Sequence, residues 1–316
     1  MNSITHKIKI TSVTLILLLS SLFIKAQYDA MFTQYMFNEM FINPAYAGSK
    51  EALAVNLLHR QQWVDFPGRP ITTSFTLHGP LMNDKMGVGL SLLNEKIGVL
   101  NRNLAYLSYA YRVKVSKKGK LSFGIMGGIH NQQSNLGQLK TTESNDNRFI
   151  QNSPSLIAPN FGGGIYYYTN NFYTGLSIPR LVDDNITFSS NQATTGSKIN
   201  PSKFHYYFTL GRVFSLKDNL KFKAQAMLKA VENAPVQYDL NINFLINELV
   251  WLGASYRSGA DASAIIGFQI NPQFVVSYSY DYALTKIQKY SQGSHEIALG
   301  YVFGYKPKKI ITPRYF

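Results

Sequence analysis

Between residues 52 and 304 the sequence alternates large apolar side chains with small or polar ones, segment after segment. In residues 236–246 the even positions are Val, Tyr, Leu, Ile and Phe, while Gln237, Asp239 and Asn241 lie between them. A period of two predicts β-strands with one apolar and one polar face. After the N-terminal leader, no segment is long and apolar enough to predict a membrane-spanning helix.

The same alternation recurs in residues 121–130, 220–229 and 274–281. A soluble β-sandwich with one wet face has this period too. However, the predicted strands run about ten residues, the length that a tilted membrane strand needs, whereas soluble strands average about five or six. Aromatic residues also gather at strand ends, as in residues 166–173, which is typical of bilayer interfaces. Because lipid offers no hydrogen bonds, such a sheet has to close on itself. The sequence therefore predicts an all-β, transmembrane antiparallel outer-membrane β-barrel.

We predict about 14 strands, an even number that returns both ends of the barrel to one side of the membrane. They are residues 52–60, 70–79, 86–93, 103–114, 120–132, 161–169, 171–178, 203–215, 219–230, 235–246, 249–257, 261–270, 272–281 and 294–304. Connections after even-numbered strands are short, and the long loops 133–160, 179–202 and 282–293 all follow odd-numbered strands. Since outer-membrane barrels have short periplasmic turns, both termini are expected in the periplasm and loop 61–69 outside.

The ends of the chain differ from the barrel. Lys7 and Lys9 precede an apolar run, residues 10–24, that ends near Ala26, so residues 1–26 are predicted to be a secretory signal peptide rather than a membrane anchor. With no cysteine in the chain, a lipid-attachment site is excluded. Residues 27–51 carry no strand pattern and are expected to lie in the lumen or along the periplasmic rim. The barrel then occupies residues 52–304, and residues 305–316 form a basic periplasmic tail.

The net charge of +14 does not indicate nucleic-acid binding, because the basic residues are scattered rather than gathered with stacking aromatics. Most of these lysines are expected in solvated turns. Contact with lipopolysaccharide phosphates or with acidic protein surfaces is the alternative. The alternation directs Lys221, Lys223 and Lys229 inward, which is compatible with an anion-preferring lumen.

Enzymatic motifs are missing, so we predict no catalytic activity, no cofactor and no metal. His295-Glu296 lacks the second histidine of a zinc helix, and the six histidines are dispersed. Asp281 and Glu296 are predicted to be inward-facing neighbours near the outer rim. We expect them to shape the rim electrostatics or to pair with Arg257 rather than to act as an acid–base pair.

Several motifs resemble one protein family along the whole mature chain. They are Gln34-Tyr35-Met36-Phe37-Asn38, Asn43-Pro44-Ala45-Tyr46-Ala47-Gly48, Arg60-Gln61-Gln62-Trp63 with Phe66, Gly68 and Pro70, residues 159–164, residues 173–177, Trp251-Leu252-Gly253, Tyr278-Ser279-Tyr280-Asp281 and Gly293-Ser294-His295-Glu296. In this order they closely resemble the PorP/SprF family of Bacteroidetes outer-membrane proteins.

The resemblance implies a role in the type IX secretion and gliding motility machinery. Family members look like barrels that serve export or surface attachment of large cargo proteins, and some contact periplasmic lipoproteins of the machinery. Expected partners are therefore outer-membrane lipid, a secreted surface cargo protein and type IX components. Arg69 departs from the small residue usual in the family, and this bulky cation in an exterior loop is a candidate for changing which cargo protein is held.

Two motifs predict different roles. Asn43, Pro44, Tyr46 and Gly48 are expected to be structural, because Asn-Pro favours a turn and glycine permits a positive φ. In contrast, Arg60, Trp63, Phe66 and Arg69 are predicted to bind a protein partner, since exposed aromatic and arginine side chains are common interface anchors. The alternative is that Trp63 and Phe66 pack at the membrane interface.

Two classes of function follow from these predictions. One is a non-enzymatic barrel that binds or anchors secreted cargo and contacts periplasmic machinery. The other is a passive porin or small-molecule transporter, which requires an open lumen and ion conductance.

Overall fold

The computed structural model describes residues 30–81, 84–138, 153, 155–189, 192–232 and 234–304. The predicted signal peptide (1–26) and basic tail (305–316) lie outside the described residues, as does most of the predicted loop 133–160. Within these ranges, no helix is long and apolar enough to cross a membrane.

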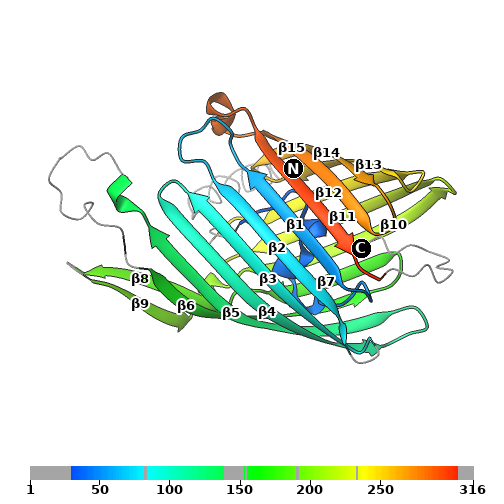
Figure 1. Cartoon of the computed structure of the whole chain (residues 1–316), viewed down its shortest axis with the longest axis horizontal. Helices are drawn as coiled ribbons and strands as arrows, with labels where there is room; N and C mark the ends of the chain where they lie inside the picture. The colour runs from blue at the N-terminus through cyan, green and yellow to red at the C-terminus, as the bar shows by residue number, and fades with distance from the viewer. Residues whose placement is uncertain are drawn as a thin grey trace, which may run out of the picture.

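Fourteen antiparallel strands form a closed barrel in which β1 pairs with β16, which confirms the predicted fold (Figure 1). The barrel strands are β1 (Ala54–Gln61), β2 (Ile71–Leu81), β3 (Met86–Ile97), β4 (Leu100–Lys114), β5 (Lys120–Ser134), β6 (Leu156–Tyr168), β7 (Phe172–Ile178), β10 (Tyr206–Lys217), β11 (Leu220–Ala230), β12 (Gln237–Ile246), β13 (Val250–Arg257), β14 (Asp261–Gln269), β15 (Phe274–Ala283) and β16 (Ser294–Val302). Each pairs with its neighbour along the chain, except that β10 follows β7. The closed ladder satisfies most backbone groups of the strands, as a membrane requires, and the start of β6 is the exception described below.

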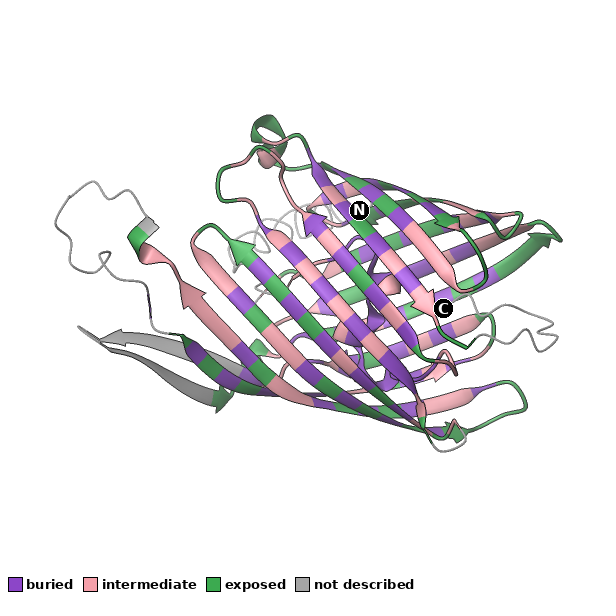
Figure 2. Ribbon diagram, in the orientation of Figure 1, coloured by how far each residue is buried: buried purple, intermediate pink, exposed green. Residues whose placement is uncertain are grey.

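The two faces of the barrel match the predicted alternation, as the bands along the strands in Figure 2 show. On β12, Tyr238, Leu240 and Ile242 are exposed on the outside, whereas Asp239 and Asn241 are buried on the lumen side. Aliphatic residues on the outer face of other strands, such as Ile125, are exposed in the same way. An outer face of this composition is suited to contact with lipid.

The two ends of the barrel differ in the length of the connections between strands. At one end, called the short-turn end, the connections are residues 82–85, 115–119, 169–171, 218–219, 247–249 and 270–273. One of these hairpins turns at Asn247 and Glu248, which both have positive φ, as a two-residue turn with the twist of the strands requires. The other end, called the long-loop end, carries the loops that contain η4 (Leu136–Gln138), η5 (Pro201–Lys203) and η6 (Lys286–Tyr290).

Strand β6 begins at Leu156, five residues before the predicted start, and includes Pro159. Proline is tolerated there because β7 pairs with β6 only from Gly163 to Tyr168. The Phe161 carbonyl accepts a hydrogen bond from the Leu181 N–H on the side of β6 away from β5. Because backbone groups two residues apart point to the same side of a strand, the Pro159 nitrogen also faces this side. A proline at such an edge removes no hydrogen bond from the barrel.

The predicted loop 179–202 contains an additional hairpin of β8 (Val182–Ser189) and β9 (Gln192–Ile199). It forms a separate two-stranded sheet that extends beyond the barrel wall at the long-loop end (Figure 1). The prediction of a loop without strands was wrong because β9 has no apolar alternation and the alternation in β8, at Val182, Ile186 and Phe188, is short.

Candidate functional site: the lumen and the long-loop end

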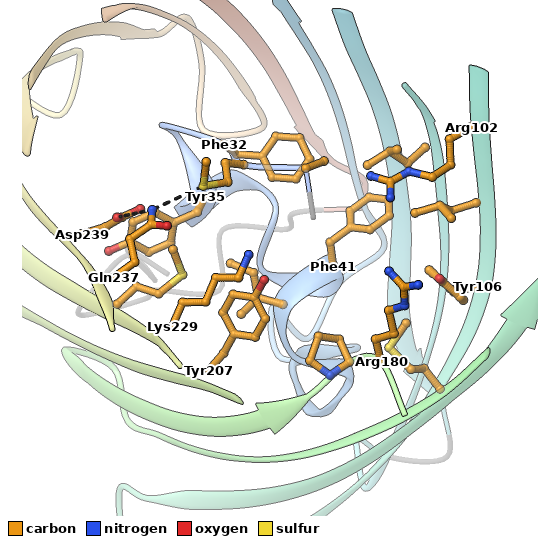
Figure 3. A pocket seen from close by; sticks show the side chains of 18 of the residues that line it. Phe32, Tyr35, Phe41, Arg102, Tyr106, Arg180, Tyr207, Lys229, Gln237 and Asp239 are labelled. Atoms are coloured by element: carbon orange, nitrogen blue, oxygen red, sulfur yellow. Dashed lines mark hydrogen bonds between the residues drawn. The ribbon is translucent and has the colours of Figure 1, made fainter. Parts of the chain in front are cut away.

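Residues 30–50, called the lumen segment, lie inside the barrel. They form three short helices, η2 (Tyr35–Phe37), α2 (Glu39–Ile42) and η3 (Pro44–Tyr46). Between residues 32 and 49 every residue except Phe37 and Phe41 is buried. The segment passes through the ring of strands in Figure 3. The polar lumen face of the strands therefore surrounds the protein's own chain along this part of the barrel.

A charged cluster holds the first part of the lumen segment. Arg60 Nη1 lies 2.6 Å from Asp281 Oδ2 and 3.1 Å from Glu296 Oε2, and all three side chains are at most 1% exposed. We call these three residues the ionic clamp. Glu296 also accepts hydrogen bonds from the backbone N–H groups of Thr33 (3.0 Å) and Gln34 (2.8 Å), and the Thr33 hydroxyl donates to Asp281 (2.8 Å). The clamp therefore joins the wall strands to the segment by charge-assisted hydrogen bonds.

The clamp differs from the predicted pairing. Asp281 and Glu296 are inward-facing neighbours, but the cation between them is Arg60 rather than Arg257. Barrel closure explains this, because Arg60 of β1 lies directly opposite Glu296 of β16. Arg257 instead pairs with Asp239 (2.9 Å) and donates a hydrogen bond to the Phe32 carbonyl (2.7 Å).

The Asn43–Gly48 motif lies in the lumen towards the short-turn end. The Asn43 side chain accepts a hydrogen bond from the Ala45 N–H and donates one to the Ile165 carbonyl of β6, both at 3.0 Å. Gly48 has a φ of +70°, which favours glycine, and its N–H donates to His78 Nδ1 at 3.0 Å. The Tyr46 ring packs edge-on against the Tyr166 ring, with 5.6 Å between centroids. The motif is thus fixed to the wall on several sides.

Glycines of the wall make room for this motif. A Cβ atom on Gly124 of β5 would lie 2.1 Å from the Ala45 nitrogen, and one on Gly87 of β3 would lie 2.1 Å from the Ala47 carbonyl oxygen. Both contacts are with backbone, which has little freedom to move away. The alternation in residues 121–130 predicts Gly124 as a small inward-facing residue of a crowded interior, but it does not indicate the contact with Ala45. Gly87 was not predicted, although it too occupies a lumen-side position of its strand.

Glu39 is buried where the lumen segment meets the wall. It interacts with the hydroxyl groups of Tyr166 and Tyr173 and electrostatically with Lys223 and Lys50. Burial raises the pKa of the Glu39 carboxyl from its ordinary 4.5 to about 7, and these neighbours act in the opposite direction. Because leaving the wall returns the carboxyl to water, docking of the segment weakens as the pH rises through about 7.

The predicted partner residues divide into two groups. Trp63, Phe66 and Arg69 are half-buried in residues 62–70 at the long-loop end, and the Trp63 and Phe66 rings pack edge-on with centroids 6.3 Å apart. Arg60 is 1% exposed inside the barrel, as a member of the ionic clamp. The structure therefore brings three of the four residues together and directs the fourth to the lumen.

Backbone hydrogen bonds fix the loop that carries Trp63. The Val64 N–H donates to the Gly293 carbonyl (2.8 Å), and the Gln292 N–H donates to the Val64 carbonyl (3.0 Å). The Trp63 N–H donates to Ser294 Oγ at 3.1 Å. The loop is thus joined to the β15–β16 connection, and its two aromatic rings are held on an ordered backbone.

Two of the three lysines predicted to face inward, Lys223 and Lys229, are buried on the lumen side of β11. Lys221 is ion-paired with Glu248 at the short-turn end. Among the residues that the structure describes, no group of His, Asp and Glu side chains has an arrangement that would hold a metal ion.

A closed antiparallel barrel with an apolar outer face and a polar lumen is an outer-membrane β-barrel. Its fold is similar to that of the monoaromatic hydrocarbon channel CymD (TM-score 0.50, 12% identity, 87% of this chain and 95% of that chain covered). It is also similar to the toluene transporter TbuX of Ralstonia pickettii (TM-score 0.49, 12% identity, coverage 84% and 93%) and to Omp33 of Acinetobacter baumannii (TM-score 0.48, 9% identity, coverage 80% and 100%). At these identities the similarity concerns the fold alone.

No curated protein matches the sequence significantly. The family model of the type IX secretion system membrane protein PorP/SprF matches residues 24–301. The chain belongs to this family, which confirms the predicted resemblance, and it is an outer-membrane protein.

Proposed function

We propose that this protein is an accessory barrel of the type IX secretion machinery that binds or anchors a secreted surface protein at its long-loop end. Its short-turn end contacts periplasmic components of the same machinery. The barrel acts through its surfaces and not by passing solutes through its lumen.

The observation that carries this proposal is the occupied lumen. Residues 30–50 lie inside the barrel, and the ionic clamp, Arg257 and Arg112 hold them there by hydrogen bonds to their backbone. Each of these bonds involves a charged side chain, and removing such a partner costs more than for a neutral bond. A passive pore requires an open lumen, and a segment bound this firmly inside the barrel obstructs it.

The surface for the secreted partner comprises Trp63, Phe66 and Arg69 together with the adjacent β15–β16 connection. That connection adds the exposed side chains of Leu284 and Tyr290. Aromatic side chains on a fixed backbone supply a large contact area and lose little entropy on binding, and arginine adds a planar group that donates several hydrogen bonds, which favours both as anchors.

Exposed lysines support a contact at the other end. Lys85, Lys114, Lys117 and Lys118 lie in or beside the β2–β3 and β4–β5 connections, at the short-turn end. A cationic rim of this kind attracts acidic protein surfaces over a distance of about 8 Å at physiological salt.

The test compares surface display of type IX cargo in cells that produce variants of the barrel. Trp63→Ala combined with Phe66→Ala is expected to reduce display several-fold while the amount of folded barrel stays normal. Arg69→Ala tests the charged part of the same surface. The matched control is Phe303→Ala, because Phe303 is an exposed aromatic residue at the short-turn end.

Display is measured by brief protease treatment of whole cells followed by mass spectrometry of the released peptides. Unchanged display in the double variant, with normal folding, would remove the proposed anchor. Equal losses in the double variant and in Phe303→Ala would show that the loss of display is not specific to the long-loop end.

The second candidate is a passive porin or small-molecule transporter. A cavity beside the lumen segment is the observation that favours it. This function requires the segment to leave the lumen, so steady ion conductance by the intact protein in planar bilayers would favour it over cargo anchoring.

A further inference from the structure

The outer face of β3, β4 and β5 changes from apolar to polar towards the long-loop end. On β3 the outward-facing Leu92 is followed by Asn94, and on β5 Ile129 is followed by Asn131. The side chains beyond this change are five amides and one lysine, which we call the amide face: Asn94, Lys96, Asn101, Asn103, Asn131 and Gln133. All six are half-buried or exposed on the outside of the barrel.

The strand register places the amide face in two adjoining rows. In one row Asn94 lies opposite Asn103, and Asn103 lies opposite Asn131. The next row consists of Lys96, Asn101 and Gln133. Directly opposite side chains have Cβ atoms about 4.5–5.5 Å apart, so one ligand can contact several of them at once.

Hydrogen bonds orient the amides of this face. Asn94 Nδ2 donates to Asn101 Oδ1 at 2.9 Å and to Asn103 Oδ1 at 2.8 Å. Asn131 Oδ1 accepts a hydrogen bond from the Ser155 hydroxyl at 2.6 Å. Because the oxygens of Asn101, Asn103 and Asn131 accept these bonds, their amide NH2 groups are the donors that a ligand can use. The face therefore offers donors and one cation, and none of its six side chains is acidic.

Strand formation does not explain the composition of the amide face. Asparagine is depleted in β-strands, yet this face carries four of them on three strands. On the opposite side of the barrel, outward residues near the long-loop end include Tyr238, Tyr256 and Tyr280, as is typical of a bilayer interface. The two sides of the barrel therefore suit different surroundings, and the amide face suits a ligand rich in hydrogen-bond acceptors.

We propose that the amide face binds the phosphorylated sugar headgroup of lipopolysaccharide in the outer leaflet of the membrane. The Lys96 ammonium and the amide NH2 groups match phosphate oxygens and sugar hydroxyls, which accept hydrogen bonds. The inference rests on the predicted orientation, with the long-loop end outside, and it does not depend on the proposed cargo role.

Continuity with the lipid-facing surface favours this occupant. The row next to Asn94, Asn103 and Asn131, towards the short-turn end, consists of the apolar residues Leu92, Ala105 and Ile129. A lipid can therefore place its headgroup on the amides while its acyl chains pack against the same three strands.

The test uses the intact protein in nanodiscs that contain equal amounts of lipopolysaccharide and phosphatidylglycerol, which are both anionic. Native mass spectrometry counts the lipids that the released barrel retains. We expect preferential retention of lipopolysaccharide. Asn94→Ala combined with Lys96→Gln and Asn103→Ala is expected to lower this retention about tenfold, because a charge-assisted contact and two amides are lost. Retention of phosphatidylglycerol should stay the same.

Gln288→Ala combined with Lys289→Gln is the matched control, because it removes an exposed amide and an exposed lysine from η6 at the same end of the barrel. It is expected to retain lipopolysaccharide like the unaltered protein. An excess of inorganic phosphate should not displace the lipid, which distinguishes a lipid headgroup from a free anion. If the triple variant does not fold, Lys96→Gln alone tests the charge.

Equal retention of the two lipids, unchanged retention by the folded variant, an equal loss in the control, or displacement by phosphate would overturn the proposal. A protein that co-purifies with the unaltered barrel but not with the triple variant, while lipopolysaccharide retention is unchanged, would assign the face to a protein partner and overturn it as well.

Discussion

Gly124→Val is expected to displace the Asn43–Gly48 motif from the barrel wall. The first added atom, Cβ, would lie 2.1 Å from the Ala45 nitrogen, 2.4 Å from the Ala45 Cα and 2.5 Å from the Pro44 carbonyl carbon. Ordinary contact between carbon atoms begins at about 3.5 Å, so η3 would have to withdraw by more than about 1 Å. Valine adds two methyl groups beyond Cβ and suits a β-strand, so the strain falls on the contact with the segment.

Overpacking of this kind costs about 1–3 kcal/mol. Because the lumen segment can leave its position more easily than a barrel strand can, we assign the cost to docking. The undocked fraction is then expected to rise about 5- to 150-fold. The readout is hydrogen exchange of residues 43–49, where the Gly48 N–H donates to His78 and the Ala47 N–H to the Pro44 carbonyl.

Gly163→Val is the matched control. Gly163 belongs to the neighbouring strand β6, and the nearest atom to its added Cβ is the Gly124 carbonyl oxygen at 3.6 Å, an ordinary contact. It is expected to leave exchange in residues 43–49 unchanged. Equal exchange in the two variants, both with normal barrel content, would refute the argument that Gly124 makes room for the motif.

Three further predictions concern the clamp, the pH dependence and the orientation of the barrel. Arg60→Met leaves the Asp281 and Glu296 carboxylates buried without their cation and should lower the free energy of unfolding by about 3–5 kcal/mol. The measurement is the guanidinium concentration at the midpoint of unfolding in lipid, which should fall; an unchanged midpoint would contradict the prediction. The protection factor of the lumen segment, which is the intrinsic exchange rate at each pH divided by the observed rate, should be lower at pH 8.5 than at pH 5.5, and Glu39→Gln should remove most of this difference; a difference that persists undiminished would assign it to another group. Since the chain has no cysteine, an impermeant maleimide on intact cells should label Lys286→Cys at the long-loop end and spare Lys118→Cys at the short-turn end. The reverse pattern would invert the predicted topology.

Most of the barrel could be predicted from the sequence because one physical rule operates on every strand. Lipid outside and polar contacts inside impose a period of two, and this period located all fourteen barrel strands to within a few residues. The rule gave no information where its conditions fail. The start of β6, which contains Pro159, lies at an open edge, and the β8–β9 hairpin lies beyond the barrel wall.

The candidate site was less predictable because it depends on long-range contacts. The inward direction of Asp281 and Glu296 followed from strand parity, but their partner Arg60 is 236 positions from Glu296 in the sequence. Only the closure of β1 against β16 brings them together. The composition of residues 27–51 indicated packing in the lumen or at the rim, and it could not name the wall residues, such as Gly124, that the segment contacts.

The most direct test of the account is purification of the tagged protein from gently solubilised outer membranes, with identification of the proteins that co-purify. The account predicts a large secreted surface protein together with type IX secretion components, and loss of the surface protein when Trp63 and Phe66 are replaced by alanine. Recovery of the barrel alone, combined with steady ion conductance in planar bilayers, would contradict it and favour the pore.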